Sequence, residues 1–248
     1  KTNYDLAKED GKDASTQKYE LEMGTIIESW SGAAADDQLA VFYGEKVYPA
    51  VYGSGDLMRR VKTDVIFSVF PAAPEQIVKT STVYKKAQDS AAKAGIVLES
   101  NNNQIKNIET GMRSAKVWDI DTIDALEVVS ATPGAKAVAE LAKYIRSKMT
   151  QGAKISLSDL WHSLQMPPFG YYNNMACAYL LGYVFRFWKN KDFNWVGNDS
   201  VPHPLTEATL ATMIVSMCQE KTVNHTLTSG SEIWQKFKPF LQKVFGLN

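Results

Sequence analysis

The sequence predicts an α+β protein in which helices predominate. Apolar residues recur at helical spacing over long stretches, whereas only a few short runs are rich enough in Val and aromatic residues to predict strands. The 248 residues are 45% hydrophobic and 22% charged, which is enough apolar material for a substantial core. No run of about 18 uncharged apolar residues occurs, so we expect no membrane-spanning helix and no membrane partner.

The first part of the chain, residues 1–131, is expected to combine helices with a pair of strands. Residues 1–14 are polar and charged, unlike a secretory signal peptide, and we expect them to be flexible. The runs QLAVFYG (38–44) and KVYPAVYG (46–53) predict the strands. Helices are expected over 15–31, from Asp56 to residue 70, from Pro74 to a C-cap at Gly95, and in one or two pieces over 101–129.

The segment SATPG (130–134) is the best candidate for a domain boundary, and it gives a second domain over 132–248. Residues 135–149 predict an amphipathic helix, followed by the short extended piece AKISL. Ser158 is the expected N-cap of a short second helix, and Asn173 or Asn174 that of a third. The inward face of the first helix is expected to carry Val138, Leu141, Ile145 and Met149, and two more helices are expected in TEATLATMIVSMCQ and SEIWQKFKPFLQKVFG.

The order helix, strand, helix, turn, helix and strand pair is that of a winged helix. In this interpretation FRFW (185–188) and FNWV (193–196) form a small β-hairpin around KNKD, and residues 171–188 occupy the position of the DNA-reading helix. A base-reading helix needs an exposed face with Arg, Lys, Asn or Gln. The run MACAYLLGYVF is apolar on nearly every side, so we expect this helix to be buried.

Gly182 lies inside that apolar helix, where glycine costs about 1 kcal/mol relative to Ala. Close approach of another backbone would offset this cost. We expect the helix to pack against the N-terminal part of the chain or against a partner, and ordinary packing within the domain is the favoured explanation.

The best candidates for contact with nucleic acid or a partner interleave cations with aromatic rings at the end of this helix and beyond it. Such a combination can hold a phosphate backbone and stack bases. Residues 133–248 hold 12 Lys and Arg against 7 Asp and Glu, whereas residues 1–132 hold 15 against 20. The predicted contact residues are Arg186, Trp188, Lys189, Lys191 and Trp195.

No motif predicts a catalytic, cofactor-binding or metal-binding residue. A phosphate-binding loop and paired-Cys or HExxH motifs are absent, and the three histidines are isolated in the sequence. Cys177 and Cys218 lie in apolar helical patterns, as expected for free core thiols in a reducing, cytoplasmic protein. One alternative is a free-standing enzyme whose site is assembled around His162, Cys177 and His203. Another is a direct DNA-binding module, with an affinity that falls steeply with salt.

The segment LSDLWHSLQMPPFGYY, with the apolar helix after it and PLTEATLATMI further on, resembles a module in large bacterial P-loop ATPases. These include the ATPases of BREX and Pgl-type phage-defence systems, where a PPFG or PYG turn precedes an apolar helix. The upstream VFPAAPEQI is similar to a segment that follows their ATPase core. The resemblance covers residues 133–215 and, loosely, 60–100.

This resemblance implies a winged-helix-like accessory region of a defence or DNA-handling machine. It brings no catalytic residue with it, because the Walker motifs of the family have no counterpart in this sequence. The chain starts at Lys1 rather than at an initiator Met, and we expect it to be a fragment of something longer. The expected function is therefore that of a non-catalytic region of a larger bacterial ATPase, contacting protein or DNA.

Overall fold

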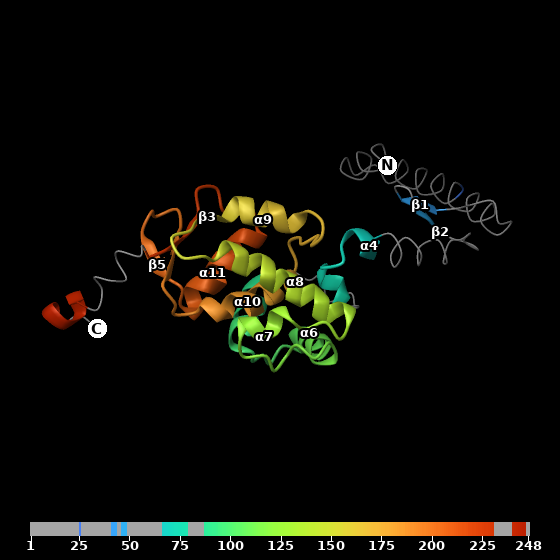
Figure 1. Ribbon diagram of the computed structural model, residues 1–248, viewed down its shortest axis with the longest axis horizontal. Coiled ribbons are helices and arrows are strands. Elements are labelled where there is room, and N and C mark those ends of the chain that lie inside the picture. Colours follow the sequence, from blue (N-terminus) through green and yellow to red (C-terminus); the bar gives the residue numbers. More distant parts are fainter. Residues whose placement is uncertain are drawn as a thin grey trace, which may run out of the picture. The chain divides into compact units, whose positions relative to one another are not determined.

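The protein is mixed α/β, with many helices and a small antiparallel sheet (Figure 1). The computed structural model describes residues 25, 41–43, 46–48, 66–78, 87–230 and 240–246. The chain divides into two compact units, unit 1 up to Val69 and unit 2 from Phe70 onward.

In unit 1, the described elements include a two-stranded antiparallel hairpin and a short helix. Strand β1 (Val41–Tyr43) pairs with β2 (Lys46–Tyr48), which confirms the predicted strand pair at shorter lengths. The short helix is α4 (Phe67–Val69). Apart from Thr25, which is helical, the helix predicted over 15–31 lies outside the described residues, as do residues 1–14 and most of the helix predicted from Asp56.

Unit 2 contains most of the described elements, and caps fix where several of its helices begin. Thr132 caps α8 and is followed by Pro133 at the first helical position, where the missing N–H has no consequence. Ser156, not the predicted Ser158, caps α9, because its Oγ accepts a hydrogen bond from the Asp159 amide at 3.2 Å. The elements are η2 (Pro74–Gln76), α5 (Gln88–Val97), α6 (Asn103–Ser114), α7 (Ile123–Glu127), α8 (Pro133–Lys148), β3 (Lys154–Ser156), α9 (Leu157–Gln165), α10 (Met175–Phe185), η4 (Arg186–Trp188), β4 (Phe193–Val196), β5 (Pro202–Pro204), α11 (Glu207–Cys218) and β6 (Thr226–Ser229).

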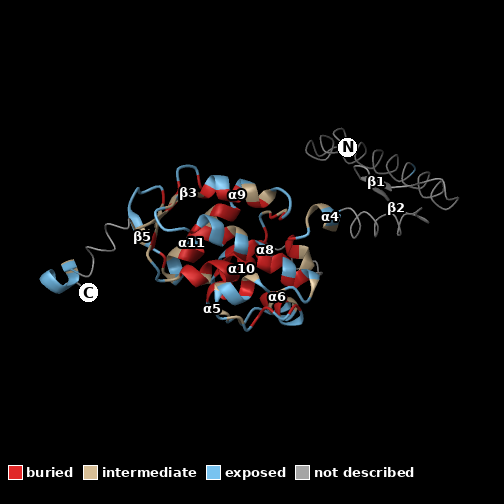
Figure 2. Ribbon diagram, in the orientation of Figure 1, coloured by how far each residue is buried: buried red, intermediate tan, exposed pale blue. Residues whose placement is uncertain are grey.

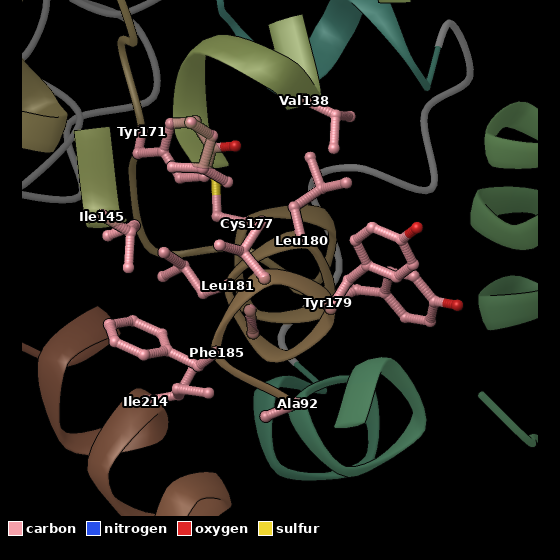
Figure 3. Close-up of a cluster of buried hydrophobic side chains, with 14 of the residues drawn as sticks. Ala92, Val138, Ile145, Tyr171, Cys177, Tyr179, Leu180, Leu181, Phe185 and Ile214 are labelled. Carbon is pink, nitrogen blue, oxygen red and sulfur yellow. The ribbon is translucent and has the colours of Figure 1, made fainter. Parts of the chain in front are cut away.

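Helix α10 forms the centre of the core, as its composition predicts. All of its residues from Met175 to Phe185 are buried, and Figure 2 shows it enclosed by partly exposed helices. Seen end-on in Figure 3, its side chains point toward Ala92 of α5, Ile145 of α8 and Ile214 of α11. The predicted inward face of α8, Val138, Leu141, Ile145 and Met149, is also buried. A helix enclosed on all sides cannot enter a DNA groove.

Two glycines allow α5 and α10 to cross in close contact. A Cβ on Gly182 would lie 2.4 Å from the Ala92 carbonyl oxygen, and a Cβ on Gly95 would lie 2.2 Å from that of Tyr179. Of the alternatives that Gly182 left open, close approach of the N-terminal part is the one observed, through Ala92 of α5, although ordinary packing within residues 132–248 was the favoured explanation. The predicted C-cap at Gly95 is wrong: α5 continues to Val97 and is capped by Leu98 at a φ of 62°.

This crossing joins residues on either side of the boundary expected at 131/132. Helix α5 comes from the first part of the chain and α10 from the second, yet both belong to one hydrophobic core. The expected boundary therefore lies inside unit 2, which begins at Phe70.

The sheet of unit 2 has the strand order β3-β6-β4-β5, with every neighbouring pair antiparallel. The hairpin predicted between 185–188 and 193–196 is wrong, because residues 186–188 continue α10 as a 3-10 turn. Strand β4 instead forms a hairpin with β5, in which Trp195 faces His203. On its other side β4 pairs with β6, which lies about 30 residues further along the chain, a separation that no local pattern reveals.

Candidate interaction groove along α8

The structure places Arg186, a predicted contact residue, in a structural role at the end of α10. Its guanidinium lies over the rings of Tyr183 and Phe187, 4.4 and 4.5 Å from their centroids. It donates hydrogen bonds to the backbone carbonyls of Tyr183 and Ile120. Arg186 thus fixes the C-terminal turn of α10 to the segment before α7, with two of its nitrogens bound to backbone carbonyls.

The two predicted tryptophans are also packed inside unit 2. Trp188 is only 6% exposed and meets Phe185 edge-on, with ring centroids 6.4 Å apart. Trp195 is half-buried between His203 and His225, at 5.8 and 5.6 Å. Trp188 is thus buried where base stacking would need an exposed ring, and Trp195 is only partly exposed.

Of the five predicted contact residues, Lys191 alone is exposed, and Arg186, Lys189 and Trp195 are half-buried. The two lysines flank Asn190, whose φ of 59° turns the chain, and whose amide donates to the Leu205 carbonyl at 2.8 Å. Two lysines on one turn do not make the predicted cation and aromatic surface.

The three side chains of the alternative enzyme site have separate surroundings. Cys177 is fully buried, and Asn174 Nδ2 donates to its Sγ at 3.0 Å. His203 Nε2 lies 2.7 Å from Asp199 Oδ2, whereas His162 is exposed on α9. Among the described residues, no group of three His, Cys, Asp or Glu side chains could hold a metal ion.

Burial raises the pKa of Cys177 well above its ordinary value and that of Cys218 to about 12. We therefore predict that neither thiol reacts with Ellman's reagent at pH 8 in the folded protein. The raised pKa values also make the free energy of unfolding depend on pH. The thiols' contribution to it is complete below the unfolded thiol pKa of about 8.5, and it declines as the pH rises toward 12, because only the unfolded thiols ionise in that range. Urea unfolding between pH 7 and pH 10 measures the decline.

The Cys177→Ala/Cys218→Ala variant is the control, since its stability should fall less over the same pH range. The buried tyrosines remain in both proteins, so the difference between the two profiles isolates the thiols. Rapid labelling of native Cys177 would contradict the buried assignment.

Unit 2 has a series of three adjoining hollows along the exposed face of α8, which we call the α8 groove. The first lies against residues 127–130 and shares Glu140 and Lys143 with the second. The second shares Tyr144 and Lys148 with the third, which reaches β3. Helix α9 forms the opposite wall of the second and third hollows, alongside α8 in Figure 1.

The turn from Met166 to Phe169 closes the middle of the α8 groove with apolar side chains. Pro167 and Pro168, joined by a cis peptide bond, are exposed, and Met166 is 51% exposed. Phe169 is buried and packs on the ring of Tyr144, with centroids 5.0 Å apart. The middle hollow, of about 670 Å³, is thus lined by two aromatic rings that pack on each other.

Lysines border this apolar surface along its length. Lys143 is paired with Glu140 at 2.7 Å, whereas Lys148 lies over the Tyr144 ring at 5.4 Å. Within the part of the chain that the structure describes, Lys136, Lys148 and Lys154 have no carboxylate partner. The carboxylates that line the groove are Glu127, bound by Arg146 at 2.9 Å, Glu140, and Asp159.

The sequence predicts the amphipathic helix over 135–149 and a turn at MPPFG, but not that the two form one surface. The spacing of Lys136, Lys143 and Lys148 places them on the outer face of a helix, which is typical of simple solvation. The signal that was available is Met166-Pro-Pro-Phe, an apolar run in a turn that should be polar.

No protein-family model, curated protein or solved structure matches this chain. None of the described helices is long and apolar enough to cross a membrane.

Proposed function

We propose that this chain is a non-catalytic accessory region of a larger bacterial ATPase, one that serves in phage defence. The α8 groove carries this proposal, as the surface through which unit 2 contacts another protein. An exposed Met beside an ordered aromatic ring is typical of the centre of a protein interface, and the rim of an interface is polar, as the border of this groove is.

The proposal includes a winged-helix-like ancestry for residues 132–230. The succession α8, β3, α9, α10, β4, β6 and the strand order β3-β6-β4 support it, with β5 and α11 inserted where the wing would be. In this region α10 has the position of a reading helix but the surroundings of a core helix. Such a domain would keep the winged-helix arrangement but would bind its partner through a face other than that of α10.

Protein contact is favoured over DNA contact by the chemistry of the groove. A phosphate backbone is bound by cations and gains little from Met166, Pro167 or Pro168. The Arg and Trp side chains predicted to contact DNA are instead used inside the unit.

Photo-crosslinking in the bacterium that makes the protein tests this function. Benzoylphenylalanine replaces Met166 in the groove or, as the matched control, the exposed Ala208 of α11. We expect a covalent product from position 166 alone, joined to a polypeptide segment of a protein that carries a Walker A motif. Equal products from both positions, or a product with nucleic acid, would contradict the proposal.

A further inference from the structure

The charges and shape of the α8 groove point to an acidic ligand. Resting on the proposed function, we propose that the groove binds an acidic peptide segment of a partner protein, with a bulky apolar side chain anchored between Tyr144 and Met166. Three observations, on charge, anchoring and length, carry this proposal.

The unpaired charges of the groove indicate the sign of the charge that a partner segment would carry. Lys136, Lys148 and Lys154 have no carboxylate partner among the residues described, and only Asp159 of the lining acids is likewise without a basic one. Asp159 lies in the first turn of α9, where the helix N-terminus already favours its negative charge. The groove therefore has spare positive charge, which an acidic segment would neutralise.

The middle hollow provides the anchor. Tyr144 lines it, in ring contact with Phe169, and the Lys148 ammonium lies over the Tyr144 ring at 5.4 Å. Its outer wall is Met166, whose flexible side chain can adapt to different apolar groups. A Leu or Phe side chain placed there would cover surface that is exposed in the described part of the chain.

The spacing of the lysines sets the length of the segment. Lys136 and Lys148 are twelve positions apart on α8, which corresponds to about 18 Å along the helix axis. An extended peptide of about six residues spans this distance. A short acidic segment can therefore reach both lysines while it anchors one apolar side chain between them.

Fluorescence anisotropy with defined peptides tests this inference on the whole chain. The probe is a fluorescein-labelled peptide of about ten residues in which Glu alternates with Leu and Phe. A second peptide has Gln in place of every Glu, and a duplex DNA of about 20 base pairs provides a polyanion without apolar side chains. We expect the Glu peptide to bind at least about tenfold more tightly than the Gln peptide in low salt, and the difference to shrink as salt is added.

Two groove variants and one control assign the site. Replacing Lys136, Lys148 and Lys154 with Glu should weaken binding of the Glu peptide by more than about tenfold, and Met166→Ala by about threefold. The control replaces the exposed Lys106, Lys191 and Lys221 with Glu, which makes the same change in net charge away from the groove. All six lysines are exposed, so both triple variants should fold.

Each contrary result has a distinct meaning. Equal losses in the two triple variants would overturn the proposed site, since binding would then follow net charge alone. Equal binding of the Glu and Gln peptides, still weakened by Met166→Ala, would overturn the acidic partner but leave the groove as a protein-contact surface. DNA binding that exceeds peptide binding and is lost only in the groove triple variant would overturn both.

Discussion

Replacing Gly182 with Ala is expected to lower the free energy of unfolding by about 3 kcal/mol or more. In an exposed helix the same change stabilises by about 1 kcal/mol, because Ala is the better helix former. Here the new methyl carbon would lie 2.4 Å from the Ala92 carbonyl oxygen, which belongs to the backbone of α5. Relief of this clash requires α5 and α10 to move apart, which opens the centre of the core.

Urea unfolding followed by circular dichroism measures the effect. Gly95→Ala, on the opposite side of the same crossing, should behave alike, because its Cβ would meet the Tyr179 carbonyl oxygen at 2.2 Å. Gly152→Ala is the control: at a φ of 78° it carries backbone strain of about 1–2 kcal/mol, but nothing lies within 4 Å of the new carbon. A Gly182→Ala protein at least as stable as wild type would show that α5 and α10 do not cross as described.

The central role of α10 could be predicted because it depends on local information. A run of eleven residues without a polar face has no stable place at a surface, and Asn174 before it is a strong N-cap whose Oδ1 accepts from the Cys177 amide at 2.8 Å. Gly182 within that run indicated a close neighbour. Composition could not indicate that the neighbour is α5, because a glycine such as Gly95 near the end of a helix is explained just as well by a C-cap as by close packing.

The sheet and the α8 groove were not predictable from the sequence, because both depend on contacts between segments that are far apart in it. Strand β6 lies between β3 and β4 although it comes last of the described strands, so both of its pairings join segments far apart in the sequence. The groove joins the outer face of α8 to a turn that follows α9. Each part has an ordinary local explanation, and the surface exists only once the helices are placed side by side.

The aromatic and basic run from Arg186 to Trp195 shows how one pattern can fit two structures. Rings interleaved with cations suit a nucleic-acid surface, yet they suit equally well a chain that turns at the edge of a core. Burial decides between the two, and for Arg186 the deciding contact is the Ile120 carbonyl in the segment before α7. That segment lies 66 residues away in the sequence.

Trp188→Ala tests this distinction directly. Because Trp188 is 6% exposed and packs on Phe185 at the end of α10, its removal should leave a cavity and lower the free energy of unfolding by about 3–5 kcal/mol. Urea unfolding measures the loss, and Trp188→Phe should recover more than half of it by refilling most of the space.

Lys191→Ala is the matched control from the same turn, since its exposed side chain should change stability by no more than about 0.5 kcal/mol. A surface role for the run predicts the opposite pattern: Trp188→Ala and Lys191→Ala would both leave stability unchanged and both weaken binding to duplex DNA at low salt. If Trp188→Ala destabilises and Lys191→Ala does not, the indole belongs to the core, and a binding surface of unit 2 must be sought on another face, where the α8 groove offers both apolar side chains and unpaired charge.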